Sequence, residues 1–353
     1  MDSYISDIQN SLYDTLGKSL DHQIQNNHLK NSSTSSIHSF SFYFFLVNYI
    51  DIDFTLWLTW LLTPLLITFV LPLIIVILLY TTALILYVYK WHWNRVRTTF
   101  GQGDKWGAAR KAVAALWDAH GWIWHGYEVT GLDNLNNNEP GLIIYYHGAI
   151  PIDLYYFITK VLLFKNRLVH TVADYFLFKI PGFSIIAEGM NVIPGTVQTC
   201  STVLKDGNLL AIAPGGVYES QFSHNYNLMW KKRLGFAKVA IDAKVPIIPM
   251  FTENVREAFR TVSFGKKLFL KIYAATKIPV APIYGGFPVK MITHVGKPIP
   301  YDPNLSPEDL QAKVAQAINE LVIKHQRLPG SITHALLDRI PYLRLKNDLV
   351  KHK

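Results

Sequence analysis

Cysteine is almost absent from this chain. Its 353 residues include one cysteine, Cys200, so neither an intramolecular disulfide nor a cysteine-based metal cluster can form. Cys200 falls within residues 196–205, which have a helical pattern away from any turn, and this position argues against a thiol nucleophile. The low cysteine content fits a reducing compartment.

Several motifs of well-known chemistry are missing as well. The sequence has no Gly-x-Ser-x-Gly elbow, no Walker loop and no His-Glu-x-x-His pair, so it gives no support for a serine hydrolase or for those nucleotide and zinc sites. No zinc-finger or RNP-type signature accompanies the formal net charge of +9. The excess of basic over acidic residues therefore favours an anionic membrane surface or an anionic substrate as the binding partner, and nucleic acid is not expected as a partner.

The N-terminal segment lacks the basic start and the early apolar run of a signal peptide. Residues 1–41 are polar, and such a segment buries too little apolar surface to offset the entropy lost on ordering. We expect them to form a disordered tail. Asn31-Ser-Ser33 within it matches a glycosylation sequon, which has meaning only in a lumenal compartment.

Charged side chains are absent from Phe54 to Tyr89. As one helix this run would be about 54 Å long, whereas the hydrocarbon core of a bilayer is about 30 Å thick. A helix buried in a soluble core is disfavoured by the same length. Because Pro64 and Pro72 lie inside the run, we predict a transmembrane hairpin of two short helices within residues 42–90.

Charges flank this run unevenly. Asp51 and Asp53 precede it, and Lys90, Arg95 and Arg97 follow it. The positive-inside rule then predicts that the large C-terminal part faces the cytosol. A hairpin would keep the N-terminus on the same side, whereas a single crossing would place Asn31 in the lumen.

From residue 91 onward, apolar runs of strand length alternate with helical patterns. The main expected strands are 142–146, 167–173, 209–213, 245–251 and 289–295, and the main expected helices are 153–164, 196–205, 231–243 and 306–328. Such alternation predicts an α/β domain with a mostly parallel sheet flanked by helices. We assign it residues 91–338, followed by a basic tail at 339–353. An amphipathic helix at 104–120 has two equal interpretations, a helix on the bilayer surface or a core helix with a Trp-rich face.

The first informative turn follows the expected strand at 142–146. It contains His147, Gly148, Pro151 and Asp153. Loops at the carboxyl ends of strands are where α/β sheets place their chemistry. A histidine there can act as a base near neutral pH, and a nearby carboxylate can fix its tautomer. The alternative is a histidine that only caps a helix or bonds a backbone carbonyl.

The second informative turn follows the strand at 209–213. It reads Pro214-Gly215-Gly216, with Glu219 three residues later. The glycines allow close approach of the backbone to a ligand, and their N–H groups can face an anion or a polarised carbonyl. Glu219 could hold an acceptor hydroxyl or orient a partner residue. The alternative is an ordinary loop. No Lys or Arg lies in the turn, which argues against a phosphorylated acceptor.

The sequence resembles the glycerolipid acyltransferase superfamily in the order of four features. These are a membrane anchor, a strand-end His with a following Asp, a Pro-Gly-Gly turn, and Val-Pro-Ile-Ile-Pro at 245–249. Longer blocks are similar to its transmembrane protein 68-like family. They cover Tyr-His-Gly-Ala-Ile-Pro-Ile-Asp at 146–153, Phe-Lys-Ile-Pro-Gly-Phe at 178–183, residues 235–252, and Tyr-Gly-Gly-Phe-Pro-Val at 284–289. The resemblance extends from about residue 55 to about residue 337.

This resemblance implies an endoplasmic-reticulum membrane enzyme that moves an acyl group from acyl-CoA to a mono- or diacylglycerol, giving triacylglycerol. It implies that His147 is the general base and that Asp153 supports it. The superfamily usually has four residues between the two, and this chain has five. The second turn resembles the Gly-Gly-x-x-Glu of type-2 diacylglycerol acyltransferases more than the usual Pro-Glu-Gly block, which favours a neutral acceptor.

We therefore expect acyl-CoA as co-substrate, a glyceride acceptor, the lipid bilayer as partner, and neither a cofactor nor a metal. The sequence indicates no oligomeric state. Two alternatives remain. One is a lysophospholipid (1-acylglycerol-3-phosphate type) acyltransferase, which would need a phosphate-binding cation such as Arg256, Arg260 or Lys290. The other is a non-catalytic membrane scaffold on the same fold. The expected substrate-binding residues are Gly148, Pro214, Gly215, Gly216 and Glu219.

Overall fold

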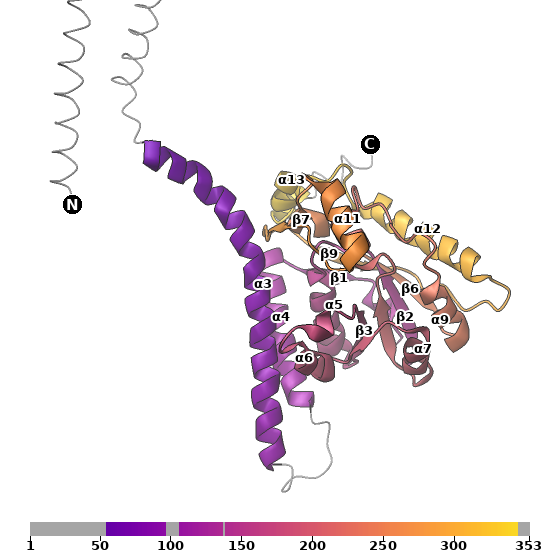
Figure 1. Cartoon of the computed structure of the whole chain (residues 1–353). Coiled ribbons are helices and arrows are strands. Elements are labelled where there is room, and N and C mark those ends of the chain that lie inside the picture. Colours follow the sequence, from indigo (N-terminus) through magenta and orange to yellow (C-terminus); the bar gives the residue numbers. More distant parts are fainter. Residues whose placement is uncertain (1–53, 97–105, 137, 345–353) are drawn as a thin grey trace, which may run out of the picture. The chain divides into compact units, whose positions relative to one another are not determined.

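The helix that contains the uncharged run is continuous. The computed structural model describes residues 54–96, 106–136 and 138–344 (Figure 1). Within them, α3 (Phe54–Val96) continues through Pro64 and Pro72. The predicted hairpin, with its break at these prolines, is therefore wrong for the residues described. A proline removes one backbone hydrogen bond of a helix, and the remaining bonds can keep the helix continuous. The tail at 1–41, the start of the predicted hairpin and residues 345–353 lie outside the described residues.

One helix in the described residues is long and apolar enough to cross a membrane. It is Leu58–Trp91 of α3, 34 residues that are scarcely buried. At about 51 Å it exceeds a hydrocarbon core of about 30 Å. This helix suggests that the protein is associated with a membrane.

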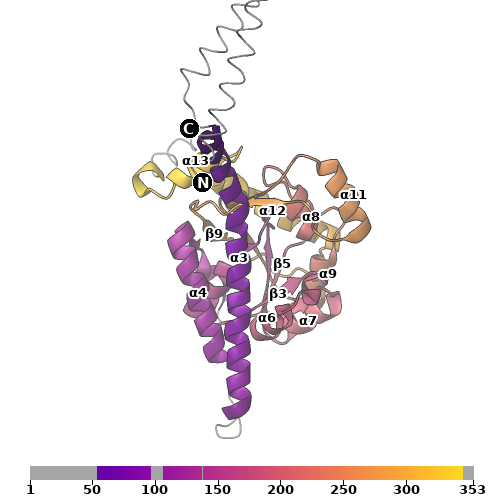
Figure 2. The same ribbon diagram turned by 60° about the vertical axis from the view of Figure 1, so that its left-hand side comes forward.

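The part of α3 that follows Pro64 runs beside α4 (Gly107–His125) in both views (Figures 1 and 2). The Trp117 indole N–H of α4 donates to the Thr82 hydroxyl at 3.0 Å. Leu86 is fully buried, and Gly189 is packed so closely that an added Cβ would lie 2.9 Å from the Leu86 side chain. Of the two interpretations of the helix expected at 104–120, the core helix is the one observed, since Trp106 and Trp117 are buried.

The main sheet has seven strands in the order β1-β9-β6-β2-β5-β3-β4. Five of them run parallel, and β9 and β1 run the other way, because β9 is antiparallel to β6 and parallel to β1. The predicted α/β fold with a mostly parallel sheet is confirmed. The strands are β1 (Glu128–Thr130), β2 (Gly141–Tyr145), β3 (Val169–Ala173), β4 (Val192–Pro194), β5 (Leu209–Ile212), β6 (Ile247–Thr252) and β9 (Ile292–Val295). A small antiparallel pair is formed by β7 (Phe259–Thr261) and β8 (Ile283–Gly285).

Helices cover both faces of this sheet. The remaining elements are η1 (Leu132–Asn134), α5 (Ile152–Lys165), η2 (Leu177–Lys179), α6 (Phe183–Met190), α7 (Val197–Lys205), α8 (Gly216–Phe222), α9 (Gly235–Ala243), α10 (Val255–Ala258), α11 (Lys266–Thr276), α12 (Pro307–His325) and α13 (Ile332–Leu337). Successive side chains of a strand point to opposite faces. Ile143 therefore packs with Phe157 of α5, and Leu142 and Ile144 pack in a second cluster with residues of α9 and α12.

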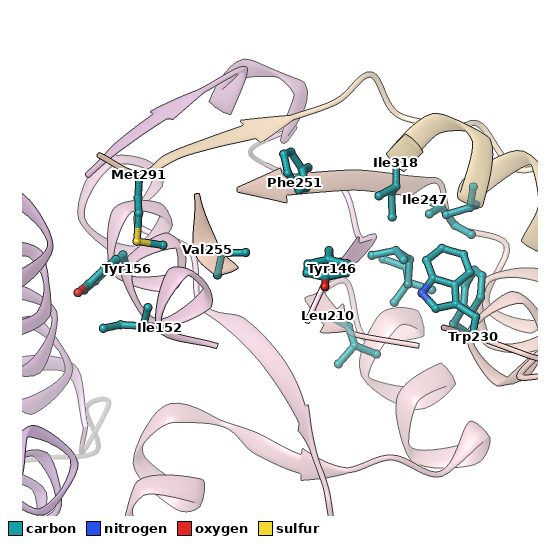
Figure 3. Close-up of a cluster of buried hydrophobic side chains, with 14 of the residues drawn as sticks. Tyr146, Ile152, Tyr156, Leu210, Trp230, Ile247, Phe251, Val255, Met291 and Ile318 are labelled. Atoms are coloured by element: carbon teal, nitrogen blue, oxygen red, sulfur yellow. The ribbon is translucent and has the colours of Figure 1, made fainter. Parts of the chain in front are cut away.

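Figure 3 shows part of that second cluster. Tyr146 directly follows β2, Leu210 and Phe251 lie in β5 and β6, and Ile318 of α12 and Trp230 of the loop before α9 belong to the same cluster. All five are buried. Burial of this apolar surface holds the strand ends, and therefore the loops that follow them, in fixed positions.

The domain continues beyond the boundary expected at residue 338. Arg339 donates from Nη1 to the Trp124 carbonyl at 2.7 Å and from Nη2 to the Ile123 carbonyl at 3.0 Å. These carbonyls belong to the last turn of α4, where an arginine satisfies acceptors that the helix leaves open. Arg344 also reaches the carboxylate of Glu253 at 3.5 Å. The described part of the basic segment is thus packed against the domain.

Candidate active site

His147 stands at the carboxyl end of the central strand. All five residues of β2 are buried, and β2 pairs with β5 on one side and with β6 on the other. The chain leaves β2 through Tyr146 and His147, with the loops after β5 and β6 on either side. The carboxyl edge of parallel strands is the usual place for a ligand site in an open α/β sheet.

The ring of His147 has a defined tautomer. Its Nδ1 lies 2.7 Å from the carbonyl oxygen of Gly148. A carbonyl can only accept, so the proton is on Nδ1 and the lone pair is on Nε2. Burial lowers the pKa of His147 from 6.5, with a further contribution from the charge of Arg256. The ring is therefore a neutral imidazole at physiological pH, able to accept a proton at Nε2.

Glu219 holds the backbone of His147 in place. Its side chain is fully buried, Oε2 accepts from the His147 N–H at 3.0 Å, and Oε1 accepts from the Met229 N–H at 2.8 Å. Burial raises the pKa of Glu219 to about 7, and the two amide hydrogen bonds oppose this rise. Each oxygen therefore accepts one backbone N–H, so the described contacts of Glu219 orient the backbone of the first turn.

Asp153 lies in the first turn of α5 and is also buried. Its Oδ1 has no hydrogen-bond partner in the part of the chain that the structure describes. Burial raises the pKa of Asp153 to about 6, and the Thr252 hydroxyl opposes the rise. Among the described contacts none joins Asp153 to the ring of His147, whose Nδ1 bonds the Gly148 carbonyl. The structure brings the two residues to one edge of the sheet without pairing them.

The Pro-Gly-Gly turn is contacted by a cation that sequence reasoning missed. Arg233 Nη1 donates to the carbonyls of Pro214 at 2.9 Å and Gly215 at 2.8 Å. Arg233 is 18 residues from Gly215 in the sequence, so no local motif could have indicated it. The N–H of Gly216 donates to the Ala213 carbonyl at 3.1 Å and is not available to a ligand.

At positions 148 and 215, close contacts leave no room for a side chain larger than that of glycine. A Cβ on Gly148 would lie 2.6 Å from Cγ2 of Val255, and a Cβ on Gly215 would lie 2.4 Å from Glu219. Val255 is buried and cannot move aside easily. In the part of the chain that the structure describes, the N–H groups of these two glycines donate no hydrogen bond. They are the candidate donors to an oxyanion.

Of the three cations considered at the sequence level, Arg256 is the one next to the base. It is 9% exposed and donates from Nη1 to the Tyr146 hydroxyl at 3.1 Å. Arg260 lies in β7 and contacts Glu257. Lys290 is engaged elsewhere, by the Gly126 carbonyl and the carboxylate of Glu128.

Two cavities adjoin these loops. One of about 320 Å³ is largely apolar and reaches the second turn, because Pro214 and Arg233 line it together with Val172, Val197, Cys200, Ile212, Phe236 and Val239. The other, of about 180 Å³, is polar, and it is lined by Arg256, which donates to the Tyr146 hydroxyl next to His147. An apolar cavity at the second turn and a polar cavity that contains Arg256 suit a substrate with an aliphatic chain and a polar part.

One group of side chains has the composition of a metal site. The ligand atoms of Glu253, His294 and His325 lie within 4.8 Å of one another. His294 Nε2 instead bonds Glu253 Oε1 at 2.6 Å, and the two imidazole rings stack at 3.6 Å between centroids. Lone pairs of stacked rings lie in parallel planes and do not converge on one ion. The group is arranged as a hydrogen-bonded pair with a stacked ring.

Comparison with known proteins indicates the family of this chain. The family model "Acyltransferase" matches residues 126–253, which include His147, Asp153 and the second turn. The chain is 49% identical over 289 residues to the human "DGAT1/2-independent enzyme synthesizing storage lipids", covering 82% of this chain and 88% of that protein. It is also 49% identical over 288 residues to the cattle protein of that name, covering 81% and 85%.

Among solved structures, the chain is similar to the 1-acyl-sn-glycerophosphate (LPA) acyltransferase PlsC from Thermotoga maritima. The identity is 18%, the TM-score is 0.43, and the match covers 68% of this chain and 95% of that one. The identities to the human and cattle proteins extend over most of both chains, and they carry the assignment. The chain therefore belongs to the transmembrane protein 68-like family of glycerolipid acyltransferases.

Proposed function

We propose that the protein transfers a fatty acyl group from acyl-CoA to the hydroxyl of a mono- or diacylglycerol, giving triacylglycerol. The contact that carries this proposal is the 2.7 Å hydrogen bond from His147 Nδ1 to the Gly148 carbonyl, because it leaves Nε2 free as a base. The names of the human and cattle relatives, which describe synthesis of storage lipids, support the neutral product.

The proposed reaction has two proton transfers, one during attack on the thioester and one when coenzyme A leaves. Nε2 of His147 takes the proton of the glyceride hydroxyl while its oxygen attacks the thioester carbonyl. The C–S bond then breaks, coenzyme A leaves as a thiolate, and the imidazolium returns the proton to that sulfur. A general base of this kind contributes about 10²–10⁴-fold. No cofactor, metal or covalent enzyme intermediate takes part in the proposed reaction.

Two carboxylates support the base in different ways. Glu219 fixes the backbone at His147 through the hydrogen bond at 3.0 Å. Asp153 offers a buried oxygen with no partner, and such an acceptor is stabilised by any donor that reaches it. We assign Asp153 to the imidazolium that forms during turnover, when the ring gains a second N–H and can turn from the Gly148 carbonyl.

Membrane attachment places the reaction where its lipid substrates are. We propose that α3 anchors the protein in the endoplasmic reticulum membrane and that the catalytic domain faces the cytosol. The basic residues after the apolar run favour this orientation. Diacylglycerol then arrives from the bilayer, and acyl-CoA arrives from the cytosol.

A second function is favoured by one observation. Arg256 and Arg260 both line the polar cavity, as a lysophospholipid acyltransferase would require. Such an enzyme would use the same base and would bind the phosphate of its acceptor. The non-catalytic scaffold predicts that loss of His147 has no effect on lipid synthesis.

One assay separates these functions. Membranes containing the wild type, His147→Ala or the control His334→Ala receive labelled oleoyl-CoA with diacylglycerol and lysophosphatidate in parallel. We expect triacylglycerol from the wild type and the control, and a loss of about 10²-fold or more in His147→Ala. Labelled phosphatidate instead would establish the second function. Equal products from His147→Ala and the wild type would exclude His147 as the base.

A further inference from the structure

The polar cavity contains more positive charge than its own carboxylate can balance. It lies over the loop after α8 and the segment from α10 to α11, and its lining includes Gln221, His224, Arg256, Glu257, Arg260 and Lys266. Three of these side chains are permanently cationic at neutral pH and one is acidic. Burial and the neighbouring cations Lys266 and Arg256 lower the pKa of His224, so its ring is neutral and adds no charge.

Arg256 forms no ion pair among the residues that the structure describes, although its charge lowers the pKa of the buried Glu219 carboxyl. It is 9% exposed, and the Tyr146 hydroxyl is the acceptor of its guanidinium among the described residues. The one acid of the lining, Glu257, accepts from the Tyr226 hydroxyl and lies 3.4 Å from Arg260. A buried cation without a counter-charge is costly. The arrangement therefore suits an anion that enters the cavity.

Gln221 gives an independent indication of a ligand. Its side chain is 5% exposed and lines the same cavity, yet neither Oε1 nor Nε2 has a hydrogen-bond partner within the described residues. A buried amide left in this state costs free energy unless a ligand satisfies it. Nε2 can donate to an anionic oxygen beside Arg256, and Oε1 can accept from a ligand hydroxyl or amine.

We infer that this cavity binds a phosphate ester group of a substrate, an inference that rests on the proposed function. A guanidinium presents a planar set of donors that matches phosphate oxygens, and Arg260 and Lys266 add charge at the same cavity. Arg256 also connects the cavity to the base, because it bonds Tyr146, the neighbour of His147. The phosphate belongs either to coenzyme A or to a phosphorylated acceptor.

Two cavity variants test the inference in the full-length protein in detergent micelles. Arg256→Gln removes the buried cation. Lys266→Gln removes a cation that is half-buried at the start of α11, so it should leave folding intact. Lys324→Gln, on the exposed face of α12, is the matched control. The donors are oleoyl-CoA and oleoyl-pantetheine, which has the same thioester without phosphates, and the acceptors are diacylglycerol and lysophosphatidate.

We expect the KM for oleoyl-CoA to rise about 10- to 100-fold in both cavity variants, because one hydrogen bond to a charged group contributes about that factor. The KM for oleoyl-pantetheine should stay unchanged, as should every constant of the control. A rise confined to lysophosphatidate would instead assign the phosphate to the acceptor. Unchanged constants for both phosphorylated substrates in both variants would overturn the inference.

Direct binding of coenzyme A, measured by titration calorimetry, separates this inference from the proposed function. If the wild type makes no acylated product but binds coenzyme A, and both variants weaken that binding, the cavity assignment stands and the proposed function fails. If the wild type makes triacylglycerol while both variants keep its affinity for coenzyme A and its KM values, the function stands and the cavity assignment fails.

Discussion

At His147 the pH dependence of the rate follows from burial. The pKa of the ring lies below 6.5, because burial disfavours the cation and Arg256 repels it, while the Gly148 carbonyl only partly compensates. A base works when it is neutral, so the rate is full above its pKa and falls as the pH is lowered through it. We expect kcat/KM with diacylglycerol to fall on the acid side with a midpoint below 6.5, measured from about pH 5 to pH 8.

Glu219→Gln tests the residue that positions this base. Both Glu219 oxygens accept from backbone N–H groups, whereas glutamine has one oxygen and an NH₂ group that would face an N–H. One amide, of His147 or of Met229, would lose its acceptor. We expect kcat to fall about 10-fold and stability to drop by about 1–3 kcal/mol, the usual cost of an unsatisfied buried group. Glu320→Gln, which is exposed on α12, is the control.

The pH profile of this variant distinguishes positioning from general destabilisation. Burial raises the pKa of Glu219 to about 7, so protonation of Glu219 would give an acid limb near that pH. If the limb of the wild type lies near pH 7 and disappears in Glu219→Gln, Glu219 and not His147 controls it. A limb that keeps its midpoint below 6.5 in both proteins belongs to His147. Full kcat in Glu219→Gln would contradict the positioning role.

At the scale of the elements, α3 has both buried and exposed apolar side chains. After Pro64 it contributes buried side chains such as Ile75, Ala83 and Leu86 to the domain, while Leu66 and Ile77 remain more than half exposed. The Lys90 ammonium adds an ion pair to Glu188 at 2.6 Å. The helix therefore contributes both to the core and to the exposed apolar surface.

Leu86→Ala measures the first of these contributions. Leu86 is fully buried against Gly189, so its truncation leaves a cavity between α3 and α6. We expect a loss of about 2–5 kcal/mol of unfolding free energy, the range for such truncations in cores. Leu84→Ala is the control, since Leu84 is 60% exposed two residues away. Equal unfolding midpoints for the two variants in the same detergent would show that α3 does not pack on the domain.

Elements with a strong local pattern were predictable from sequence. The apolar runs became β2, β5 and β6, and the Ser306 cap of α12 accepts from the Asp309 N–H at 3.1 Å as its sequence indicates. Others depend on long-range contacts. The prolines of α3 suggested a break that the helix does not show, and the second turn continues into α8 at Gly216, a helix that the sequence pattern did not predict.

The candidate site also has residues that could be predicted from the sequence and contacts that could not. His147, Asp153 and Glu219 could be named from two strand-end turns, because parallel strands bring such turns to one edge. The contacts that cations make at these turns could not be predicted from the sequence. Arg233 reaches the second turn from 18 residues away, and Arg256 reaches Tyr146 from 110 residues away. Contacts over such separations are set by the fold, and no spacing rule indicates them.

At the scale of the whole molecule, the continuous α3 predicts a membrane topology, and this topology can be measured. A hairpin would return the chain to the side from which it came, whereas the described residues contain one candidate crossing, Leu58–Trp91. The basic residues after it favour a cytosolic domain. One crossing then places the sequon Asn31-Ser-Ser33 on the lumenal side.

We therefore expect Asn31 to carry a glycan in cells that glycosylate lumenal sequons. The protein should migrate more slowly on a gel, endoglycosidase H should remove the difference, and Asn31→Gln should abolish it. A sequon added after Lys353 should stay unmodified, which serves as the internal control for orientation. A modified C-terminal sequon with an unmodified Asn31 would reverse the orientation and place the base in the lumen. If neither sequon is modified, the two ends share the cytosolic side, and a second crossing before Phe54 is required.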